Sequence, residues 1–195
     1  MSSSNKIKIV ALFGKSAAGK DTVQKELLKQ GDFHKIVSCT TRFPREGEVD
    51  GIDYHFLTHK GFTEDLFENK FIEALEFNGW FYGTKIEDLN KEKINIGIFT
   101  PEGILCLIDS EYSCNLSILP IYIECPDKIR LMRALDREED PNIGEICRRY
   151  EADEKDFNII DYYFRSVRND NEPTALKDSV QKILDYTKAF FVQDK

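Results

Sequence analysis

The chain has 195 residues, of which 41% are hydrophobic and 32% are charged, a composition that excludes a disordered, collagen-like or disulfide-scaffold protein. Lysine and arginine total 27 against 35 aspartate and glutamate, so the formal net charge is −8. An acidic protein is a poor general binder of nucleic acid or of membrane surfaces. We therefore expect anions to bind only where cations gather locally, with neither nucleic acid nor membrane as a partner.

Two further features bear on where the protein works. The apolar runs are no longer than strands, and the first six residues lack the apolar stretch of a signal peptide. The five cysteines are odd in number and form no CxxC pair, which predicts reduced thiols. We expect a cytoplasmic protein that is either a monomer or a homodimer.

The first half of the chain opens with a near-continuous apolar run at residues 7–13, which predicts a central parallel strand buried on both faces. Residues 22–30 follow with helical spacing, and Gly31 ends this predicted helix. The expected elements after it are a short strand at 35–38, a polar loop at 39–51, a strand at 53–57, a helix at 58–69 and a strand at 71–77.

The second half begins with a β-branched segment at 94–99, which predicts another central strand. Pro101 starts a helix at its first turn, where a missing N–H costs nothing. The expected elements after it are a strand at 116–125, helices at 129–135 and 143–157, a last strand at 162–167 and a closing helix at 175–191. Alternating strands and helices predict an α/β fold with a mainly parallel sheet.

The segment after the first predicted strand matches the pattern GxxxxGK between a strand and a helix, which is the context of a phosphate-binding P-loop. Gly14 and Gly19 allow backbone angles that turn several N–H groups toward one anion, and the next helix adds its positive N-terminal end. Lys20 would neutralise the β- and γ-phosphates. The predicted ATP-binding residues are Gly14, Lys15, Ser16, Ala17, Ala18, Gly19, Lys20, Asp21 and Thr22.

Position 21 departs from the P-loop pattern, which has Ser or Thr after the lysine. The usual hydroxyl ligand of Mg²⁺ is therefore absent, and we expect no direct protein ligand to the metal. Asp21 either contacts the ion through water or only caps the helix, while Thr22 can hydrogen-bond a phosphate. ATP and Mg²⁺ are the predicted cofactors.

A second anion site is predicted at residues 38–56, which read SxTTRxPRxGExxGxDYxF. Arg42 and Arg45 flank a proline, a geometry suited to forking a phosphate. Phe-Ile-Glu at 71–73 and Tyr-Gly-Thr at 82–84 add a carboxylate, a phenol and a hydroxyl. Taken singly, these are also ordinary sheet aromatics and solvated surface charges. Their joint spacing favours a binding site.

Together with the P-loop, this long motif resembles the nucleotide-monophosphate region of guanylate kinases, almost without a gap over residues 6–84. The resemblance implies a three-layer P-loop NTPase-type α/β fold, with a mainly parallel core sheet, a small inserted mixed α/β lobe that binds the nucleoside monophosphate, and a helical lid. It implies a single guanylate kinase-like domain over 1–195, with the core at 6–34, 94–130 and 158–195, the lobe at 35–93 and the lid at 131–157.

The resemblance also assigns roles to single residues. Glu73 matches the carboxylate that accepts hydrogen bonds from guanine N1–H and the exocyclic amine, which adenine cannot satisfy. Thr84 matches a hydroxyl near guanine O6. Ser38, Arg42, Arg45 and Tyr54 match positions that hold the GMP phosphate, with Tyr82 as a second phenol and Glu48 in the same lobe. The implied GMP-binding residues are Ser38, Arg42, Arg45, Glu48, Tyr54, Glu73, Tyr82, Thr84 and Thr100.

The predicted lid carries further arginines. Arg133 and Arg137 are spaced i, i+4 on one predicted helix face, and Arg148 follows an acidic stretch. This spacing resembles the arginines that frame the lid of guanylate kinases. The alternative is a helix face laced with salt bridges to the nearby acidic residues. The implied catalytic residues are Lys20, Arg42, Arg133, Arg137 and Arg148, with Arg130 and Lys128 as spare candidates.

One position departs from the family's pattern in the base site. Thr100 stands where many guanylate kinases carry an aspartate that contacts guanine, which leaves the strictness of base selection open. The predicted activity is that of a nucleoside monophosphate kinase, in which ATP phosphorylates GMP, dGMP or both by in-line transfer. The alternatives are a kinase for another or a broader range of (deoxy)nucleoside monophosphates, and a non-catalytic guanylate kinase-like binding module.

Overall fold

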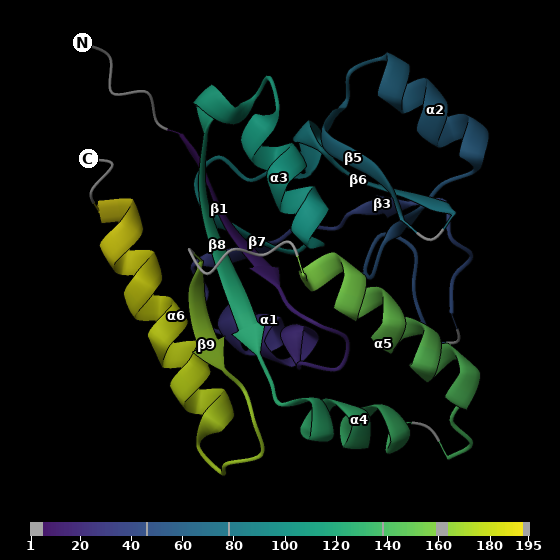
Figure 1. Ribbon diagram of the computed structural model, residues 1–195. Coiled ribbons are helices and arrows are strands. Elements are labelled where there is room, and N and C mark those ends of the chain that lie inside the picture. The colour runs from purple at the N-terminus through teal and green to yellow at the C-terminus, as the bar shows by residue number, and fades with distance from the viewer. Residues whose placement is uncertain (1–5, 46, 78, 138, 159–163, 193–195) are drawn as a thin grey trace.

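The computed structural model describes residues 6–45, 47–77, 79–137, 139–158 and 164–192 (Figure 1). Its core is a five-stranded sheet in the order β2-β7-β1-β8-β9, in which every neighbouring pair is parallel. In that order the strands are β2 (Phe33–Lys35), β7 (Ile94–Ile98), β1 (Ile7–Phe13), β8 (Leu116–Glu124) and β9 (Arg165–Arg168).

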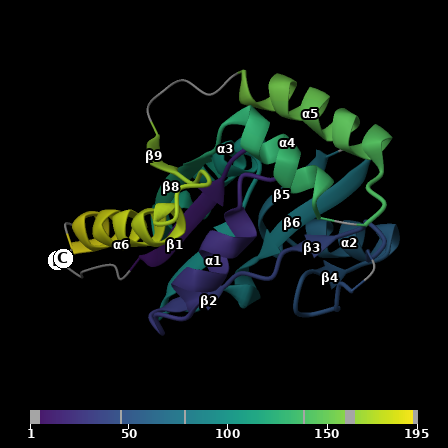
Figure 2. The same cartoon turned by 90° about the horizontal axis from the view of Figure 1, so that it is seen from below.

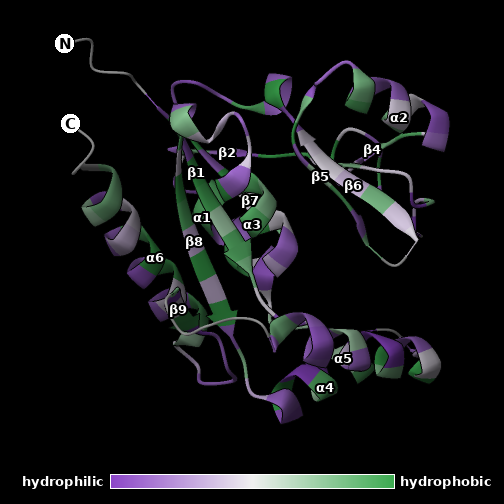
Figure 3. Cartoon of the chain, turned by 45° about the horizontal axis from the view of Figure 1, so that its top comes forward, coloured by the Kyte–Doolittle hydropathy of each residue, from purple (hydrophilic) through white to green (hydrophobic). Residues whose placement is uncertain are grey.

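Helices cover both faces of this sheet because the alternate side chains of β1 point to opposite sides. Val10 and Leu12 pack with residues of α1 (Lys20–Leu28) and α6 (Ala175–Val192). On the other face, residues of β1 pack with residues of α3 (Pro101–Asp109) and with Phe157 of α5 (Ile143–Phe157). In Figure 3, β1 and β8 are mostly green, as expected of strands buried on both faces.

A second, four-stranded sheet with the order β4-β3-β6-β5 lies beside the core (Figure 1). Its strands are β3 (Cys39–Thr40), β4 (His55–Phe56), β5 (Phe71–Phe77) and β6 (Trp80–Lys85), and α2 (His59–Phe67) packs on it. Buried Cys39, Phe62 and Phe71 form a small core of their own, with the rings of Phe62 and Phe71 4.5 Å apart. The second sheet is mixed, because β3 pairs parallel with β4 but antiparallel with β6.

The remaining elements are the short 3₁₀ helices η1 (Ile86–Asp88) and η2 (Ser113–Asn115) and the helix α4 (Asp127–Leu135). Seen from below, α4 and α5 lie on the same side of the core as the second sheet, away from α6 (Figure 2). Among the described residues, no helix has both the length and the apolar character that a membrane crossing needs.

Several element boundaries differ from the sequence predictions. The strand expected at 35–38 is β2 at Phe33–Lys35, and the stretch predicted as loop contains the short strand β3. Strand β6 was not predicted, because its sequence WFYGTK is short and shows no alternation of apolar and polar residues. The last strand ends at Arg168, and residues 162 and 163 of its predicted span lie outside the described residues.

Candidate active site

The P-loop joins β1 to α1 and is shaped by two glycines that have no room for a side chain. A Cβ on Gly14 would lie 2.5 Å from the Ile123 carbonyl oxygen, and one on Gly19 would collide with the Asn169 side chain. Gly19 also has φ +91°, a left-handed conformation that favours glycine. The loop therefore fits tightly between β8 and the end of β9, at the carboxyl edge of the core sheet.

Lys20 begins α1 and reaches back beneath the loop. Its Nζ donates to the carbonyl oxygens of Gly14 at 2.7 Å and Lys15 at 3.0 Å. Burial lowers the pKa of Lys20 below its ordinary value. The first turn of α1 follows directly, so the ammonium group and the positive end of the helix lie together at the P-loop.

Arg133 supports the P-loop from behind. Its guanidinium donates to the carbonyl oxygens of Asn169 at 3.1 Å and Asp170 at 2.8 Å, with a longer contact of 3.4 Å to Ala18. The Asn169 amide also donates to the Ala18 carbonyl at 2.9 Å. The side chain predicted as a catalytic cation is thus bonded to backbone carbonyls that hold the loop in shape.

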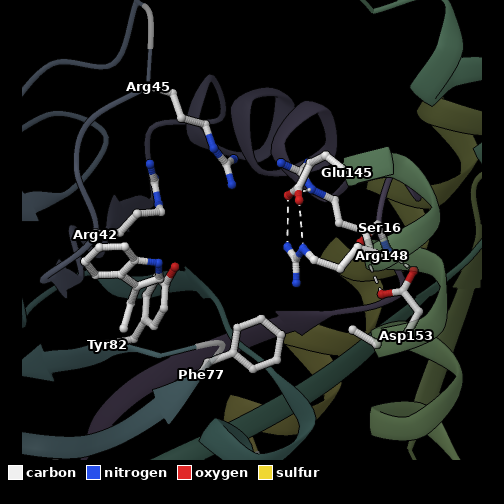
Figure 4. A pocket seen from close by; sticks show the side chains of 11 residues that line it. Ser16, Arg42, Arg45, Phe77, Tyr82, Glu145, Arg148 and Asp153 are labelled. Atoms are coloured by element: carbon white, nitrogen blue, oxygen red, sulfur yellow. Dashed lines mark hydrogen bonds and ion pairs between the residues drawn. The ribbon is translucent and has the colours of Figure 1, made fainter. Parts of the chain in front are cut away.

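An arginine-lined cavity of about 660 Å³ opens between the P-loop, the second sheet and α5. We call it the arginine cavity. Figure 4 shows Arg42 and Arg45 facing Arg148 across this space. Its lining also includes Ser16 of the P-loop, Trp80 and Tyr82 of β6, and Glu145, Arg149 and Asp153 of α5. Four guanidinium groups from two separate parts of the fold therefore converge on one space that the P-loop also borders.

The arginines on the side of the second sheet are held by Glu48. Its carboxylate accepts from Arg42 Nη2 at 2.9 Å and from the Arg45 backbone N–H at 2.7 Å. The Arg42 guanidinium also lies 5.4 Å from the centre of the Tyr54 ring. Burial, followed by the charges of Arg149 and Arg42, lowers the pKa of Arg45. The effect of Arg149 on Arg45 places these two cations near each other.

On α5, Glu145 holds two arginines at once. It accepts from Arg148 at 2.7 and 2.9 Å and from Arg149 at 2.8 Å. The Arg148 hydrogen bonds come first among the causes that lower the pKa of Glu145 to about 2. Arg148 and not Arg149 was predicted as a lid arginine, yet the side chain of Arg149 is the less exposed of the two, at 31% against 47%. Sequence spacing alone does not distinguish Arg148 from Arg149 as the lid arginine.

Arg137 lies beyond the end of helix α4, whereas the sequence predicts it on one helix face with Arg133. Helix α4 ends at Leu135, and the Asp136 N–H closes its last turn on the Met132 carbonyl at 2.9 Å. Arg137 therefore follows the helix and shares no helix face with Arg133, which corrects the predicted i, i+4 pair. It lines a further cavity of about 430 Å³ together with Arg45, Glu48 and Arg149.

Beside the arginine cavity lies a smaller pocket of about 220 Å³ that contains the buried carboxyl group of Glu73. We call it the base pocket, after the guanine contact that the sequence resemblance implies for Glu73. Glu73 is 7% exposed and sits opposite Thr84 in the β5–β6 ladder, where it accepts from the Thr84 hydroxyl and backbone N–H. Burial raises the pKa of Glu73 to about 7, against the lowering effect of these hydrogen bonds. The lining also includes Ser38, Tyr54, Tyr82 and Thr100.

Both faces of β5 are covered at the level of Glu73. Phe71 packs in the small core of the second sheet, Ile72 packs in the main core, and Glu73 is itself only 7% exposed. The interpretation of Glu73 as a solvated residue is therefore wrong. The Ser38 hydroxyl lies 3.3 Å from that of Thr84, which places both hydroxyls close to Glu73.

Thr100 and Asp21 occupy the two positions where the sequence departs from its pattern. Thr100 is the N-cap of α3, and its hydroxyl oxygen accepts from the Gly103 N–H at 3.0 Å. Asp21 is exposed in the first turn of α1. Within the described part of the chain, no group of three or more His, Cys, Asp or Glu side chains is placed to hold a metal ion.

A P-loop at the carboxyl edge of a parallel sheet, faced by converging arginines, defines a P-loop nucleotide-binding fold. The sequence model of the guanylate kinase family matches residues 6–187. The guanylate kinase of Clostridium perfringens strain SM101 is 31% identical over 183 residues, covering 90% of this chain and 80% of its own length. The chain belongs to the guanylate kinase family.

Other relatives agree with this assignment. The guanylate kinase of Bacillus subtilis is 29% identical over 185 residues, covering 90% of this chain and 87% of its own. That of Schizosaccharomyces pombe is 48% identical over 97 residues, 46% of this chain and 48% of its own. The crystal structure of guanylate kinase from Anaplasma phagocytophilum has the same fold, with a TM-score of 0.70 at 21% identity, over 95% of this chain and 86% of that one.

Proposed function

We propose that this chain transfers the γ-phosphoryl group of ATP to GMP, dGMP or both, giving ADP and the nucleoside diphosphate. The observation that carries the proposal is the shared lining of the two cavities. Ser16 of the P-loop and Tyr82 of the second sheet border both the arginine cavity and the base pocket. A donor phosphate on the P-loop and an acceptor phosphate near Tyr82 would thus meet in one space.

The acceptor base would lie against Glu73. Its ionised carboxylate offers two acceptor oxygens to the N1–H and exocyclic amine of guanine, and adenine has no matching pair of donors. Thr84 and Ser38 supply hydroxyls at the same place. The acceptor phosphate would be bound by Arg42, Arg45, Tyr54 and Tyr82, with Glu48 keeping the two arginines in position.

The donor phosphates would be bound by the P-loop, residues 14–22, with Lys20 as the neutralising cation. Mg²⁺ prefers one or two carboxylates together with water and phosphate oxygens. Asp21 is exposed in the first turn of α1, directly after the P-loop lysine, and its carboxylate would contact the ion through water. Mg²⁺ bound with ATP would neutralise phosphate charge there, with Asp21 and Thr22 as the nearby protein oxygens.

Transfer needs no covalent intermediate and no dedicated base, because positioning and cations supply the catalysis. Arg149, Arg148 and Arg42 line the arginine cavity, where the donor and acceptor phosphates would meet, and would stabilise the charge on the transferred group. Arg137 would approach from the neighbouring cavity. We assign Arg133 a positioning role, since its guanidinium is bonded to the carbonyls behind the P-loop.

The domain division follows the same proposal. We assign the core to residues 6–34, 94–130 and 158–195, the acceptor lobe to 35–93 and the lid to 131–157. The second sheet falls within the lobe, and α4 and α5 supply most of the lid. Residues 159–163 and 193–195 of the assigned core lie outside the described residues.

All five cysteines are free thiols, which supports a reducing, cytoplasmic location.

A broader acceptor range is a second candidate, favoured by Thr100. Its hydroxyl oxygen already accepts the Gly103 N–H, so it is a weaker acceptor for a base than a free carboxylate would be. One assay separates the candidates: ADP release from Mg-ATP with GMP, dGMP, AMP, dAMP, CMP, UMP and dTMP. We expect turnover with GMP, dGMP or both, and comparable turnover with several bases would instead favour the broad-range kinase.

Lys20→Met provides the control for this assay. Loss of the P-loop cation should abolish turnover, and circular dichroism should show that the variant keeps its fold. Substantial remaining turnover in Lys20→Met would contradict the proposed function. If a folded wild type binds ATP but phosphorylates none of the acceptors, the chain is instead a binding module.

A further inference from the structure

Two buried charged side chains, which are also bonded to each other, hold Ser16 of the P-loop. Asp153 of α5 accepts from the Ser16 N–H at 2.8 Å and from its hydroxyl at 3.1 Å. Arg130 of α4 donates to the Ser16 carbonyl at 3.0 Å and to Asp153 at 2.8 Å. We call this arrangement the Ser16 clamp. It uses every polar group of Ser16 and ties the P-loop to two helices far from it in sequence.

The clamp is a built site and not a chance surface contact. Arg130 is 1% exposed and Asp153 is 6% exposed. The Arg130 guanidinium also donates to Asp127 at 2.6 and 3.1 Å and lies 4.5 Å from the centre of the Tyr150 ring. A buried ion pair specifies geometry when its hydrogen bonds are satisfied.

A second link lies directly beside the clamp. Lys15, the residue before Ser16, is paired with Glu154, the residue after Asp153. Two successive P-loop residues are thus bonded to two successive residues of α5. This double attachment fixes the orientation of the helix as well as its distance from the loop.

The attachment determines where the arginines of α5 lie. Arg149 precedes Asp153 by four residues, about one helical turn, so both project from the same face of α5. Arg148 and Arg149 border the arginine cavity, and Asp153 borders it too (Figure 4). Holding Asp153 on Ser16 therefore sets the position of these arginines relative to Lys20.

Arg130 also offsets the charge of Asp153 near the donor site. A lone carboxylate at Ser16 would repel the phosphates of a donor. Asp153 and Arg130 act on Lys20 with opposite sign, the first raising and the second lowering its pKa. Arg130 therefore reduces the repulsion that Asp153 alone would exert on a donor phosphate.

We propose that Asp153 and Arg130 are positioning residues that dock α5 on the P-loop through protein groups alone and so preorganise Arg148 and Arg149 for the donor nucleotide. The proposal rests on the proposed function for its kinetic test. Because the clamp needs no phosphate to form, donor binding does not have to supply the free energy of docking. Preorganisation of this kind lowers the apparent dissociation constant of the ligand.

The test is the double variant Asp153→Ala/Arg130→Leu. Removing both members avoids an unpaired buried charge, and apolar replacement of a buried pair is often neutral for stability. We expect the KM for ATP to rise about tenfold, the fold-change that loss of roughly one net charge-assisted hydrogen bond would give. The kcat at saturating ATP and the KM for GMP should stay within about threefold of wild type. A general structural defect would not separate these constants.

Fluorescence gives a readout that does not depend on turnover. Trp80 is the one tryptophan of the sequence, and it borders the arginine cavity opposite α5. If the clamp docks α5, its removal should shift the emission of the free protein, and ATP should then produce a larger change than in wild type. Lys60→Ala/Glu64→Ala, which removes an ion pair on α2, is the matched control and should change neither quantity.

The two proposals can fail separately. A double variant whose KM for ATP stays within twofold of wild type, or whose Trp80 emission is unchanged, would overturn the clamp proposal. If the wild type binds ATP without phosphorylating any acceptor, the proposed function fails, and the clamp is then judged by the dissociation constant for ATP. An unchanged dissociation constant in the double variant overturns it, and a rise of about tenfold supports it.

Discussion

At the scale of single residues, the ionised form of Glu73 destabilises the fold and is also the form that the proposed base recognition requires. A carboxyl group that is buried to 7% exposure and raised in pKa to about 7 is kept neutral more readily than an ordinary glutamate. Base recognition requires the ionised form, because only that form offers two acceptors to guanine. The same side chain therefore opposes folding at the pH at which it serves binding.

The pH dependence of GMP use follows from this pKa. Between pH 8 and pH 6 the ionised fraction of a group with a pKa of about 7 falls about tenfold, so kcat/KM for GMP should fall by about that factor. The measurement is the pH profile of kcat/KM at saturating ATP. Glu73→Gln is the control, since the GMP phosphate titrates near pH 6 as well. A profile equally steep in both proteins would rule out Glu73 as its source.

Glu73→Gln should raise the free energy of unfolding at alkaline pH, although it weakens the use of GMP. The pKa of Glu73 in the folded protein is above its ordinary value, so its contribution to stability is full below about pH 4.5 and is lost as pH rises through 7. At pH 8 the ionised carboxylate costs up to about 3 kcal/mol relative to a neutral group. Chemical denaturation at pH 8 should therefore find Glu73→Gln more stable than wild type, although it binds GMP less well.

At the scale of elements, the pairing of β5 with β6 depends on one glycine. A Cβ on Gly83 would lie 2.9 Å from the Glu73 carbonyl oxygen, 2.9 Å from the Phe71 ring and 3.1 Å from Phe62. None of these neighbours is the free end of a flexible side chain. Gly83 therefore sets how closely α2 and the two strands approach, and with that the position of Glu73.

Gly83→Ala should damage the acceptor site selectively. Overpacking of this kind costs about 1–3 kcal/mol of stability and displaces β5 from β6. We expect the KM for GMP to rise at least about fivefold, because Glu73 moves with its strand, while the KM for ATP changes much less. Gly144→Ala on α5 is the control, since its Cβ would meet only Asn142 at 3.5 Å. Equal rises in both KM values would contradict this account.

The sequence predicts the elements whose signal is local. The apolar run of β1, the P-loop glycines and the helix at 143–157 were all found at or near their observed bounds. The bonds of Arg133 to the carbonyls at 169 and 170 were not predicted, because those residues are distant from it in sequence. The Ser16 clamp was not predicted from the sequence for the same reason, since Asp153 and Arg130 meet only when α4 and α5 are placed together.

At the scale of the whole molecule, the P-loop, the second sheet and α5 border one continuous space. A bisubstrate analogue that links adenosine and guanosine through a phosphate chain would contact all three. A ligand at a hundred times its dissociation constant stabilises a protein by about 2.7 kcal/mol. Linking the two nucleotides adds to this, because the second site is then occupied at a high effective concentration.

Thermal unfolding tests this expectation. The linked analogue should raise the Tm more than a non-hydrolysable ATP analogue and GMP do together at the same concentrations. A diadenosine compound of equal chain length is the control, because its second base cannot satisfy Glu73. An equal effect of the two linked compounds would show that the acceptor base does not enter the base pocket.

The chain leaves the core sheet after β2, forms the second sheet and returns to the core at β7 (Figure 1). Strands β2 and β7 pair with each other at one edge of the core sheet. Both covalent connections to the lobe therefore start from neighbouring points. A body held at two neighbouring points moves most easily by rotation about the line that joins them. Arg42, Arg45 and Glu73 would then swing as one rigid unit toward or away from the P-loop. The chain's topology thus suits a rotation that brings the acceptor toward the donor, and the packing of Ile72 of β5 in the main core would oppose it.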